Sequence, residues 1–197
     1  MFLYGASGHA KVIIDILELR KIEVRGLFDD NPAIKSLLDY PCLGSLNRPI
    51  QEEIIISIGD NNLRKRVSER FLLNYGMALH PTAQISERVR ISAGTVVMAN
   101  AVINTGTVIG KHVIVNTSAS IDHDCIIEDY AHISPNATLC GGVSIGEGTH
   151  FGAAAVAIPN IKIGKWVVIG AGAVVIHDVP DYAVVVGNPG KIIKYNG

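Results

Sequence analysis

The stretch IDHDCIIEDYAHISPNATL, residues 121–139, places an aliphatic residue at every sixth position. The same phase runs from Ile85 to Val175, and all sixteen positions of this series are apolar. A small or β-branched residue follows each of them four places later. A period of six fits neither an α-helix nor a flat sheet, but it is typical of a parallel β-helix, in which three hexapeptides close one triangular coil. The sequence therefore predicts a β-helix of about five coils, with residues three hexapeptides apart stacked on one another.

The phase of the repeat predicts which side chains point inward. Ile121 and Cys125 occupy inward positions, so His123 between them is expected at an outer corner, facing away from the core. His112 and His177 are expected to be solvated corner residues. Four glycines are expected at the corners because a tight corner needs backbone freedom. They are Gly110, Gly146, Gly164 and Gly170.

The composition favours a folded protein without a strong charge bias. Of the 197 residues, 48% are hydrophobic and 18% are charged, which is sufficient for an apolar core. The formal net charge of −1 gives no overall attraction to nucleic acid or anionic membranes, so neither is expected as a partner. Three cysteines without a CxxC pair disfavour a disulfide framework and a zinc site, and they favour a reducing compartment. Because we find no signal-peptide pattern and no apolar run of membrane-spanning length, we expect a cytoplasmic protein.

Residues 1–78 carry a different pattern, in which strands alternate with helices. This alternation predicts a small parallel sheet of the α/β class. The run GASGHAK, residues 5–11, lies between a strand and a helix, where backbone N–H groups can bind phosphate. Asp29 and Asp30 close the second strand and Gly59 follows the third, so all three loops are expected at the carboxyl edge of the sheet, where such folds bind ligands. A plain tight turn and a solvated acidic pair are the alternatives.

The coil, residues 85–180, resembles the left-handed β-helix acyltransferases of the hexapeptide transferase superfamily. Nearly the whole chain resembles one branch, the bacterial sugar acetyltransferases that include UDP-4-amino-sugar N-acetyltransferases and sialic-acid O-acetyltransferases. The motifs that carry this resemblance are, in chain order, YGASGHAKV, FDDN, ISIGDNNLRK, LHPTA, NTSASIDHDC and VVVGNPGKII. The resemblance implies an α/β Rossmann-like domain that binds a nucleotide-sugar at residues 1–78, a left-handed parallel β-helix acetyltransferase domain at 79–180, and a tail at 181–197 that contacts CoA.

The resemblance also implies a substrate site in the N-terminal loops and a catalytic histidine in the coil. The residues that match the substrate site are Ser7, Gly8, His9, Asp29, Asp30 and Gly59. His123 matches the general base of this family, and Asp124 after it matches the acidic residue that supports the base. A carboxylate beside an imidazole raises its basicity and fixes its tautomer. Asp122, on the other side of His123, is the alternative residue for this supporting role.

Acetyl-CoA is the implied co-substrate, and no metal is expected. The resemblance places three residues against CoA, namely His132, Ala153 and Ala171. Gly141 lies one coil after His123, and its backbone N–H is a candidate donor to the oxyanion of the transition state. Cys125 points inward and is not expected to act as a nucleophile, so the acetyl group is expected to move directly. The expected function is acetyl-CoA-dependent N-acetylation of a nucleotide-linked amino sugar, in the first place a UDP-4-amino-4,6-dideoxy sugar.

Three other functions stay open. O-acetylation of sialic acid or another sugar hydroxyl would use the same coil. A metal-dependent carbonic anhydrase is also built on this coil, but it needs three histidines that converge on zinc. A non-catalytic scaffold is the third alternative.

A homotrimer is expected, as in the resembling enzymes. Outward apolar residues recur at one place in the repeat and predict a flat apolar face, which is unusual on a monomer. They are Val96, Val102, Val108 and Ile114. The active site would then lie between subunits, with His123 of one subunit facing CoA held largely by the next.

Overall fold

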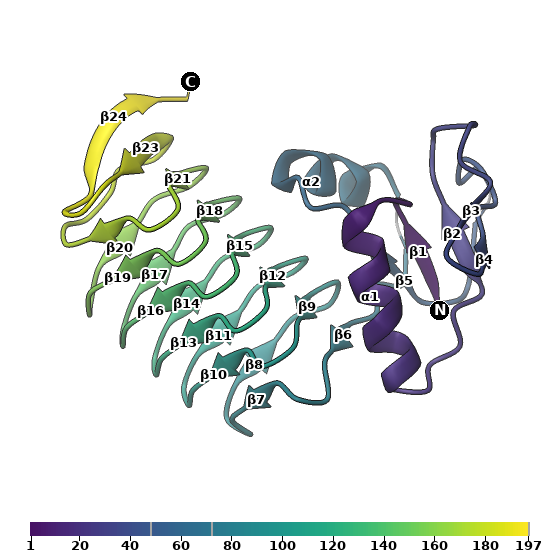
Figure 1. The fold of residues 1–197 in the computed structure, drawn as a ribbon, viewed down its shortest axis with the longest axis horizontal. Coiled ribbons are helices and arrows are strands. Elements are labelled where there is room, and N and C mark those ends of the chain that lie inside the picture. The colour runs from purple at the N-terminus through teal and green to yellow at the C-terminus, as the bar shows by residue number, and fades with distance from the viewer. Residues whose placement is uncertain (48, 72, 197) are drawn as a thin grey trace.

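The computed structural model describes residues 1–47, 49–71 and 73–196, and it consists of an α/β domain followed by a left-handed parallel β-helix (Figure 1). This architecture confirms the predicted fold. The elements of the α/β domain are β1 (Phe2–Tyr4), α1 (Gly8–Leu19), β2 (Gly26–Phe28), β3 (Ser36–Leu37), β4 (Tyr40–Pro41), β5 (Ile54–Ile56) and α2 (Asn61–Arg70).

The α/β domain is a three-stranded parallel sheet with one helix on each face. Its strand order is β2-β1-β5. Successive residues of a strand point to opposite faces, and accordingly Leu3 packs with α1 while Phe2 and Tyr4 pack with Val67 of α2. The loops after β1, β2 and β5 therefore meet at the carboxyl edge of the sheet.

The coil is built from two-residue strands, one in each hexapeptide. They are β6 (Ala78–Leu79), β7 (Gln84–Ile85), β8 (Arg90–Ile91), β9 (Val96–Val97), β10 (Val102–Ile103), β11 (Val108–Ile109), β12 (Ile114–Val115), β13 (Ser120–Ile121), β14 (Ile126–Ile127), β15 (His132–Ile133), β16 (Thr138–Leu139), β17 (Ser144–Ile145), β18 (His150–Phe151), β19 (Val156–Ala157), β20 (Lys162–Ile163), β21 (Val168–Ile169) and β22 (Val174–Val175). The chain then forms β23 (Ala183–Val186) and β24 (Lys191–Tyr195), which pair antiparallel.

The strands stack into three faces. The first face runs from β7 through β10, β13, β16 and β19 to β22, and the second from β8 through β11, β14 and β17 to β20. The third face runs from β6 through β9, β12, β15, β18 and β21 to β23 and β24. The second residue of nearly every hexapeptide strand points inward, and the predicted inward residues Ile121 and Cys125 are both 0% exposed.

Fourteen successive hexapeptides each contain one residue with a left-handed backbone, with φ between 53° and 78°. These residues are Gly94, Asn100, Gly106, His112, Ser118, Asp124, Tyr130, Asn136, Gly142, Gly148, Ala154, Asn160, Trp166 and Gly172. The prediction that the four corner glycines are needed for backbone freedom is therefore wrong, because none of them has a left-handed backbone. A methyl group added at Gly146 would instead lie 2.6 Å from the carbonyl carbon of Gly164 in the next coil, so contact between coils excludes a side chain there.

The predicted flat apolar face is also wrong. Val102 and Val108 lie on the first and second faces, where they are half-buried, whereas Val96 and Ile114 lie on the third. Val96 and Ile114 are each 1% exposed because the protein's own helix α1 packs over them. The phase of a repeat predicts which side chains point out of the coil, but it does not predict whether another domain packs over them.

A buried arginine joins the two domains. Arg64 of α2 is 1% exposed and donates hydrogen bonds to groups of both domains. Its acceptors are Ile58 O at 3.0 Å, Gly59 O at 3.2 Å, Asn61 Oδ1 at 2.8 Å, His112 O at 2.8 Å and Tyr130 O at 2.7 Å. Nε and Nη2 therefore hold α2 against the edge between the second and third faces, while Nη1 donates to carbonyls of the α/β domain itself.

His112 lies beside this arginine, which corrects the expectation of a solvated residue. It is 3% exposed and stacks on Tyr130, with ring centroids 5.4 Å apart. Burial, followed by the charge of Arg64, lowers the pKa of His112 to about 4. His177 is exposed, as expected. In the described ranges, neither helix has the length and apolar character needed to cross a membrane.

Candidate active site

His123 lies at the edge between the first and second faces, where the chain passes from β13 to β14. Its side chain is 57% exposed, as the phase of the repeat predicts. The ring nitrogen Nδ1 lies 2.8 Å from Asp124 Oδ2. This hydrogen bond, together with the charge of Asp122, raises the pKa of His123 above its usual value. When the imidazole is neutral with its proton on Nδ1, Nε2 carries the lone pair that a general base uses.

The two aspartates beside His123 have different partners. Asp124 has φ 59°, a backbone conformation that aspartate tolerates better than most residues, and this conformation turns its carboxylate toward the imidazole. Asp122 Oδ1 instead accepts from the backbone N–H of His123 at 2.8 Å and from Asn104 Nδ2 at 2.9 Å. Asp124 is thus the carboxylate that contacts the ring, while Asp122 holds the corner in place.

The imidazole lies against the following coil. A methyl group added at Gly141 would lie 2.6 Å from both Nε2 and Cε1 of His123. The two residues share a pocket of about 340 Å³ that Cys140, Pro159 and Asn160 also line. Within residues 1–47, 49–71 and 73–196, the backbone N–H of Gly141 has no hydrogen-bond acceptor. An N–H donor beside the candidate base suits a developing oxyanion.

A second pocket, of about 350 Å³, opens at the carboxyl edge of the α/β sheet and is called the nucleotide pocket below, after the ligand expected from the sequence. Ser7, Asp29 and Asp30 line it, together with Tyr4 and Ile58. Ser7 stands at the N-cap of α1, but its side chain makes no capping hydrogen bond. The sequence-predicted residues Ser7, Asp29 and Asp30 thus share one pocket.

The two aspartates of this pocket also order its walls. Asp29 accepts from Ala6 N and from Asn31 N, both at 2.8 Å, and so joins the first two loops of the sheet edge. Asp30 Oδ2 accepts from Tyr4 Oη at 2.9 Å and from Arg70 at 3.0 Å. Burial, followed by the Asp30 carboxylate, raises the pKa of Tyr4 to about 12, so this phenol is a donor.

His9 and Gly59 do not line the nucleotide pocket. His9 is largely buried, its Nε2 has no partner among the described residues, and burial followed by Arg64 lowers its pKa to about 4. Gly8 lies beside it at the start of α1, and a Cβ there would meet only open space.

His132 and His150 are neighbours on the third face. Strands β15 and β18 pair them directly, and their rings meet edge to face with centroids 4.9 Å apart. His132 Nε2 lies 3.0 Å from Asn116 Nδ2, while its buried Nδ1 has no partner in the described part of the chain. Burial, followed by His150, lowers the pKa of His132 to about 3, so this ring is neutral.

Ala153 and Ala171 are exposed along the edge between the third and first faces. That edge is not the one that carries His123. In one chain, Ala153 and Ala171 are therefore on a different edge of the coil from the expected base, while His132 lies on the third face.

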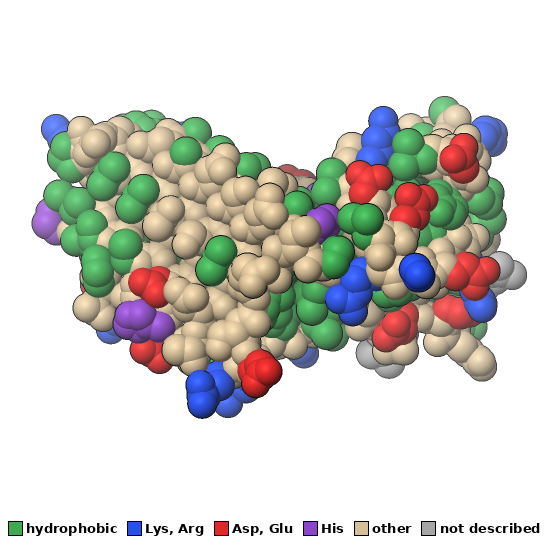
Figure 2. Space-filling model, turned by 60° about the horizontal axis from the view of Figure 1, so that its bottom comes forward, with side chains coloured by type: hydrophobic (Ala, Val, Ile, Leu, Met, Phe, Trp, Pro, Cys, Tyr) green, Lys and Arg blue, Asp and Glu red, His purple; other side chains and the backbone are tan. Residues whose placement is uncertain are grey.

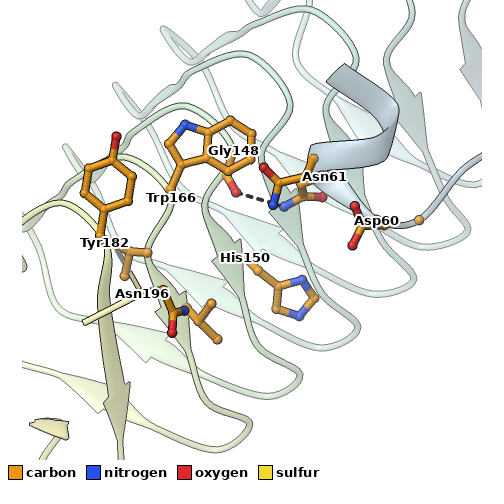
Figure 3. Close-up of a pocket in the computed structure, with 11 residues that line it drawn as sticks. Asp60, Asn61, Gly148, His150, Trp166, Tyr182 and Asn196 are labelled. Atoms are coloured by element: carbon orange, nitrogen blue, oxygen red, sulfur yellow. Dashed lines mark hydrogen bonds between the residues drawn. The ribbon is translucent and has the colours of Figure 1, made fainter. Parts of the chain in front are cut away.

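A pocket of about 580 Å³ lies where the α2 N-terminus faces the third face, and it is called the cleft pocket below (Figure 3). Figure 2 shows that the surface is hollowed between the two domains. Gly59 and Asp60 line the pocket from the α/β domain, and His150, Trp166 and Tyr182 line it from the coil. Asn61 spans the two sides by donating to Gly148 O at 3.0 Å. Gly59 was expected from sequence, and the motif ISIGDNNLRK also covers Asp60, Asn61 and Asn62, but no motif links these residues to Trp166 and Tyr182 of the coil.

No group of three or more His, Cys, Asp or Glu residues with the geometry to hold a metal ion is found among the described residues.

Models of known protein families match both the N-terminal domain and the coil of this chain. The family model described as the PglD N-terminal domain matches residues 1–71, and the bacterial transferase hexapeptide model, of six repeats, matches residues 106–141. A 72-residue segment, 35% of this chain, is 33% identical to an uncharacterized protein of Acanthamoeba polyphaga mimivirus, but it spans only 15% of that protein.

Two solved structures are similar over almost their full length. One is a histidine-to-asparagine mutant of perosamine N-acetyltransferase from Caulobacter crescentus in complex with CoA and GDP-perosamine. It is 35% identical, with 98% of this chain and 96% of that chain covered and a TM-score of 0.94. The other is the acetyltransferase domain of PglB from Neisseria gonorrhoeae in complex with acetyl coenzyme A, which is 34% identical with 98% of each chain covered and a TM-score of 0.91. The chain therefore belongs to the sugar acetyltransferases of the left-handed β-helix, hexapeptide-repeat superfamily, and it is an acetyltransferase.

Proposed function

We propose that this chain transfers an acetyl group from acetyl-CoA to the amino group of a nucleotide-linked sugar, with His123 as the general base. The observation that carries the proposal is the pair formed by His123 and Asp124. Asp124 Oδ2 lies 2.8 Å from His123 Nδ1, and His123 Nε2 lies against Gly141 in an open pocket. The complexes of the two similar structures, one with CoA and GDP-perosamine and one with acetyl coenzyme A, support both substrates.

The chemistry needs one base and one oxyanion donor. The amine nitrogen attacks the thioester carbonyl carbon, and His123 Nε2 accepts the proton that the nitrogen loses as the N–C bond forms. Asp124 stabilises the imidazolium that results, and the Gly141 N–H donates to the oxyanion. The C–S bond then breaks, and the imidazolium returns its proton to the thiolate of CoA, which restores neutral His123. No acyl-enzyme is required, and Cys125 is buried inside the coil.

The complete site is proposed to need more than one copy of the chain. The His123 edge lies between the first and second faces, whereas α1 and the loops of the nucleotide pocket stand over the third face. A neighbouring copy that places its His123 edge against the third face would unite the base with the nucleotide pocket. A homotrimer, a closed ring of identical interfaces, provides this arrangement three times.

The experiment is thiol release from acetyl-CoA with a panel of acceptors, run with wild type and His123→Ala. The panel holds UDP-linked and GDP-linked 4-amino-4,6-dideoxy sugars and free sialic acid. A UDP-4-amino-4,6-dideoxy sugar is the acceptor we propose first, and the GDP-linked sugars are included because the similar perosamine enzyme was solved with GDP-perosamine. We expect turnover with a nucleotide-linked amino sugar and a loss of about 100-fold or more in kcat in the variant.

Other outcomes separate the parts of the proposal. Turnover with free sialic acid alone would make the enzyme an O-acetyltransferase and would refute the nucleotide-linked acceptor. Unchanged kcat in His123→Ala would refute the role of the base. The absence of thiol release with every acceptor would contradict the proposed function as a whole.

A further inference from the structure

Thr107 is a buried threonine whose hydroxyl contacts the corner that carries His123. It occupies the small inward position of its hexapeptide and is 0% exposed. Its Oγ1 donates to Asp122 O at 2.8 Å and accepts from the backbone N–H of Cys125 at 3.1 Å. Asp122 and Cys125 are the first and last residues of a four-residue turn, and His123 and Asp124 lie between them. The hydroxyl is therefore inserted into the turn that presents the candidate base.

Other turns of the coil show what a turn looks like without this hydroxyl. A four-residue turn is often closed by a direct hydrogen bond from the fourth N–H to the first C=O. In the described coil, this direct bond is found wherever alanine holds the equivalent position in the preceding coil, with N–O distances of 3.1–3.3 Å. The alanines concerned are Ala83, Ala101, Ala119, Ala131, Ala137 and Ala155, and the turns that they face are 98–101, 116–119, 134–137, 146–149, 152–155 and 170–173.

Threonine at this position opens the turn and bridges it. Thr95, Thr107 and Thr149 each donate to the first C=O at 2.7–2.8 Å and accept from the fourth N–H at 3.0–3.1 Å. Among the described residues, none of these three turns has the direct bond. Valine there gives neither bond in the same part of the chain, as at Val89, Val113 and Val143. A branched side chain therefore holds the turn open, and the threonine hydroxyl replaces the partners that the two backbone groups lose.

The backbone of the opened turn decides where the imidazole lies. A turn that closes rotates the peptide groups between its first and fourth residues, and with them the directions of the two middle side chains. We infer that Thr107 is a positioning residue for the reaction, because its hydroxyl holds open the turn that places His123 Nδ1 on Asp124 and His123 Nε2 against Gly141. This inference rests on the proposed function, in which His123 is the base.

The test compares Thr107→Ala with Thr107→Ser, because alanine allows the direct turn bond whereas serine keeps the hydroxyl. We expect Thr107→Ala to lower kcat for thiol release about tenfold, since a displaced base loses its alignment with the amine. The KM for acetyl-CoA should not change, because the variant leaves the pocket residues themselves in place. Thr107→Ser should restore most of the wild-type kcat.

A second measurement follows the His123 ring itself, by NMR titration of protein labelled in its histidines. His123→Ala identifies the signals of this ring among those of the seven histidines. In wild type, the hydrogen bond with Asp124, followed by the charge of Asp122, holds the pKa of His123 above 6.5. We expect this pKa to move toward 6.5 in Thr107→Ala and to return in Thr107→Ser. A loss of stability alone would not change the titration of the folded protein.

Thr95→Ala is the matched control. Thr95 is equally buried and makes the same pair of bonds, to Gly110 O and from Val113 N, at the edge between the second and third faces. This variant should lose about as much stability in urea as Thr107→Ala, yet keep the wild-type kcat and the wild-type titration of His123. Thr107→Val tests the same hydroxyl if Thr107→Ala does not fold. It keeps the volume but leaves both backbone groups of the turn without a partner, so it should also lower kcat and the pKa of His123.

The inference is overturned if folded Thr107→Ala keeps the wild-type kcat and the wild-type titration of His123. It is also overturned if Thr107→Ser is as slow as Thr107→Ala. An equal loss of kcat in Thr95→Ala would overturn it too, because the effect would then come from the coil as a whole. Failure of the proposed function is a separate result, since it shows as absent thiol release in wild type while the titration of His123 is still measured.

Discussion

The imidazole of His123 lies on the backbone of the following coil, so one added methyl group would move it. Gly141→Ala places that methyl 2.6 Å from Nε2 and Cε1, and the exposed ring can yield by rotating away. We expect kcat to fall by roughly 10- to 100-fold, because a misplaced base loses its alignment with the amine. Thiol-release kinetics would measure this loss, with a urea unfolding curve expected to match wild type. Wild-type kcat in a variant with intact folding would show that the ring does not need this position.

The pH dependence of the reaction should report the Asp124 contact. The base acts when neutral, and the hydrogen bond from Asp124, followed by the charge of Asp122, raises the pKa of His123 above 6.5. The kcat/KM should therefore fall as the pH drops through a value above 6.5. Asp124→Asn removes the largest cause of the shift, so its acid limb should move to lower pH, while Asp122→Asn should move it less. An identical acid limb in wild type and Asp124→Asn would contradict the assignment.

Helix α2 depends on Arg64 for its position against the coil. This guanidinium satisfies four backbone carbonyls and Asn61, and it pairs with no carboxylate in the described part of the chain. Arg64→Met leaves buried carbonyls without a donor, and we expect the free energy of unfolding to fall by about 3 kcal/mol. Arg64→Lys should recover little, since an ammonium group cannot reproduce the planar fork. Urea denaturation would measure both variants, and full stability in Arg64→Met would refute this role.

Sequence periodicity predicted the elements of the coil because every hexapeptide repeats one packing solution. The inward position of Cys125 and the outward position of His123 follow from that phase alone. The corner glycines were misinterpreted, because spacing does not distinguish a residue that needs a left-handed backbone from one that needs room. Gly142 is of the first kind and Gly146 of the second, although both lie near corners.

The parts of the candidate site that sequence could not predict arise from the docking of the two domains. His112 and Ile114 have outward phase in the repeat, yet both are buried beneath the α/β domain. The cleft pocket joins Gly59 to Trp166 across the same interface, and no periodic signal links residues so far apart in the chain. The nucleotide pocket was predictable because parallel strands bring the loops after them to one edge.

The proposed sharing of the active site between copies can be tested by mixing two inactive variants. His123→Ala lacks the base, and Asp29→Ala disrupts the nucleotide pocket by releasing Ala6 and Asn31. If each site takes its base from one copy and its nucleotide pocket from the next, some sites in a mixed oligomer contain neither substitution. Each mixed trimer should then contain one intact site of three, so the mixed trimers should show roughly a third of wild-type activity and the unselected equal mixture roughly a quarter. Co-expression with two affinity tags, followed by thiol-release assay of the doubly tagged fraction, would measure it. A site contained within one chain would leave every mixed oligomer inactive, because each chain would still carry one of the two substitutions.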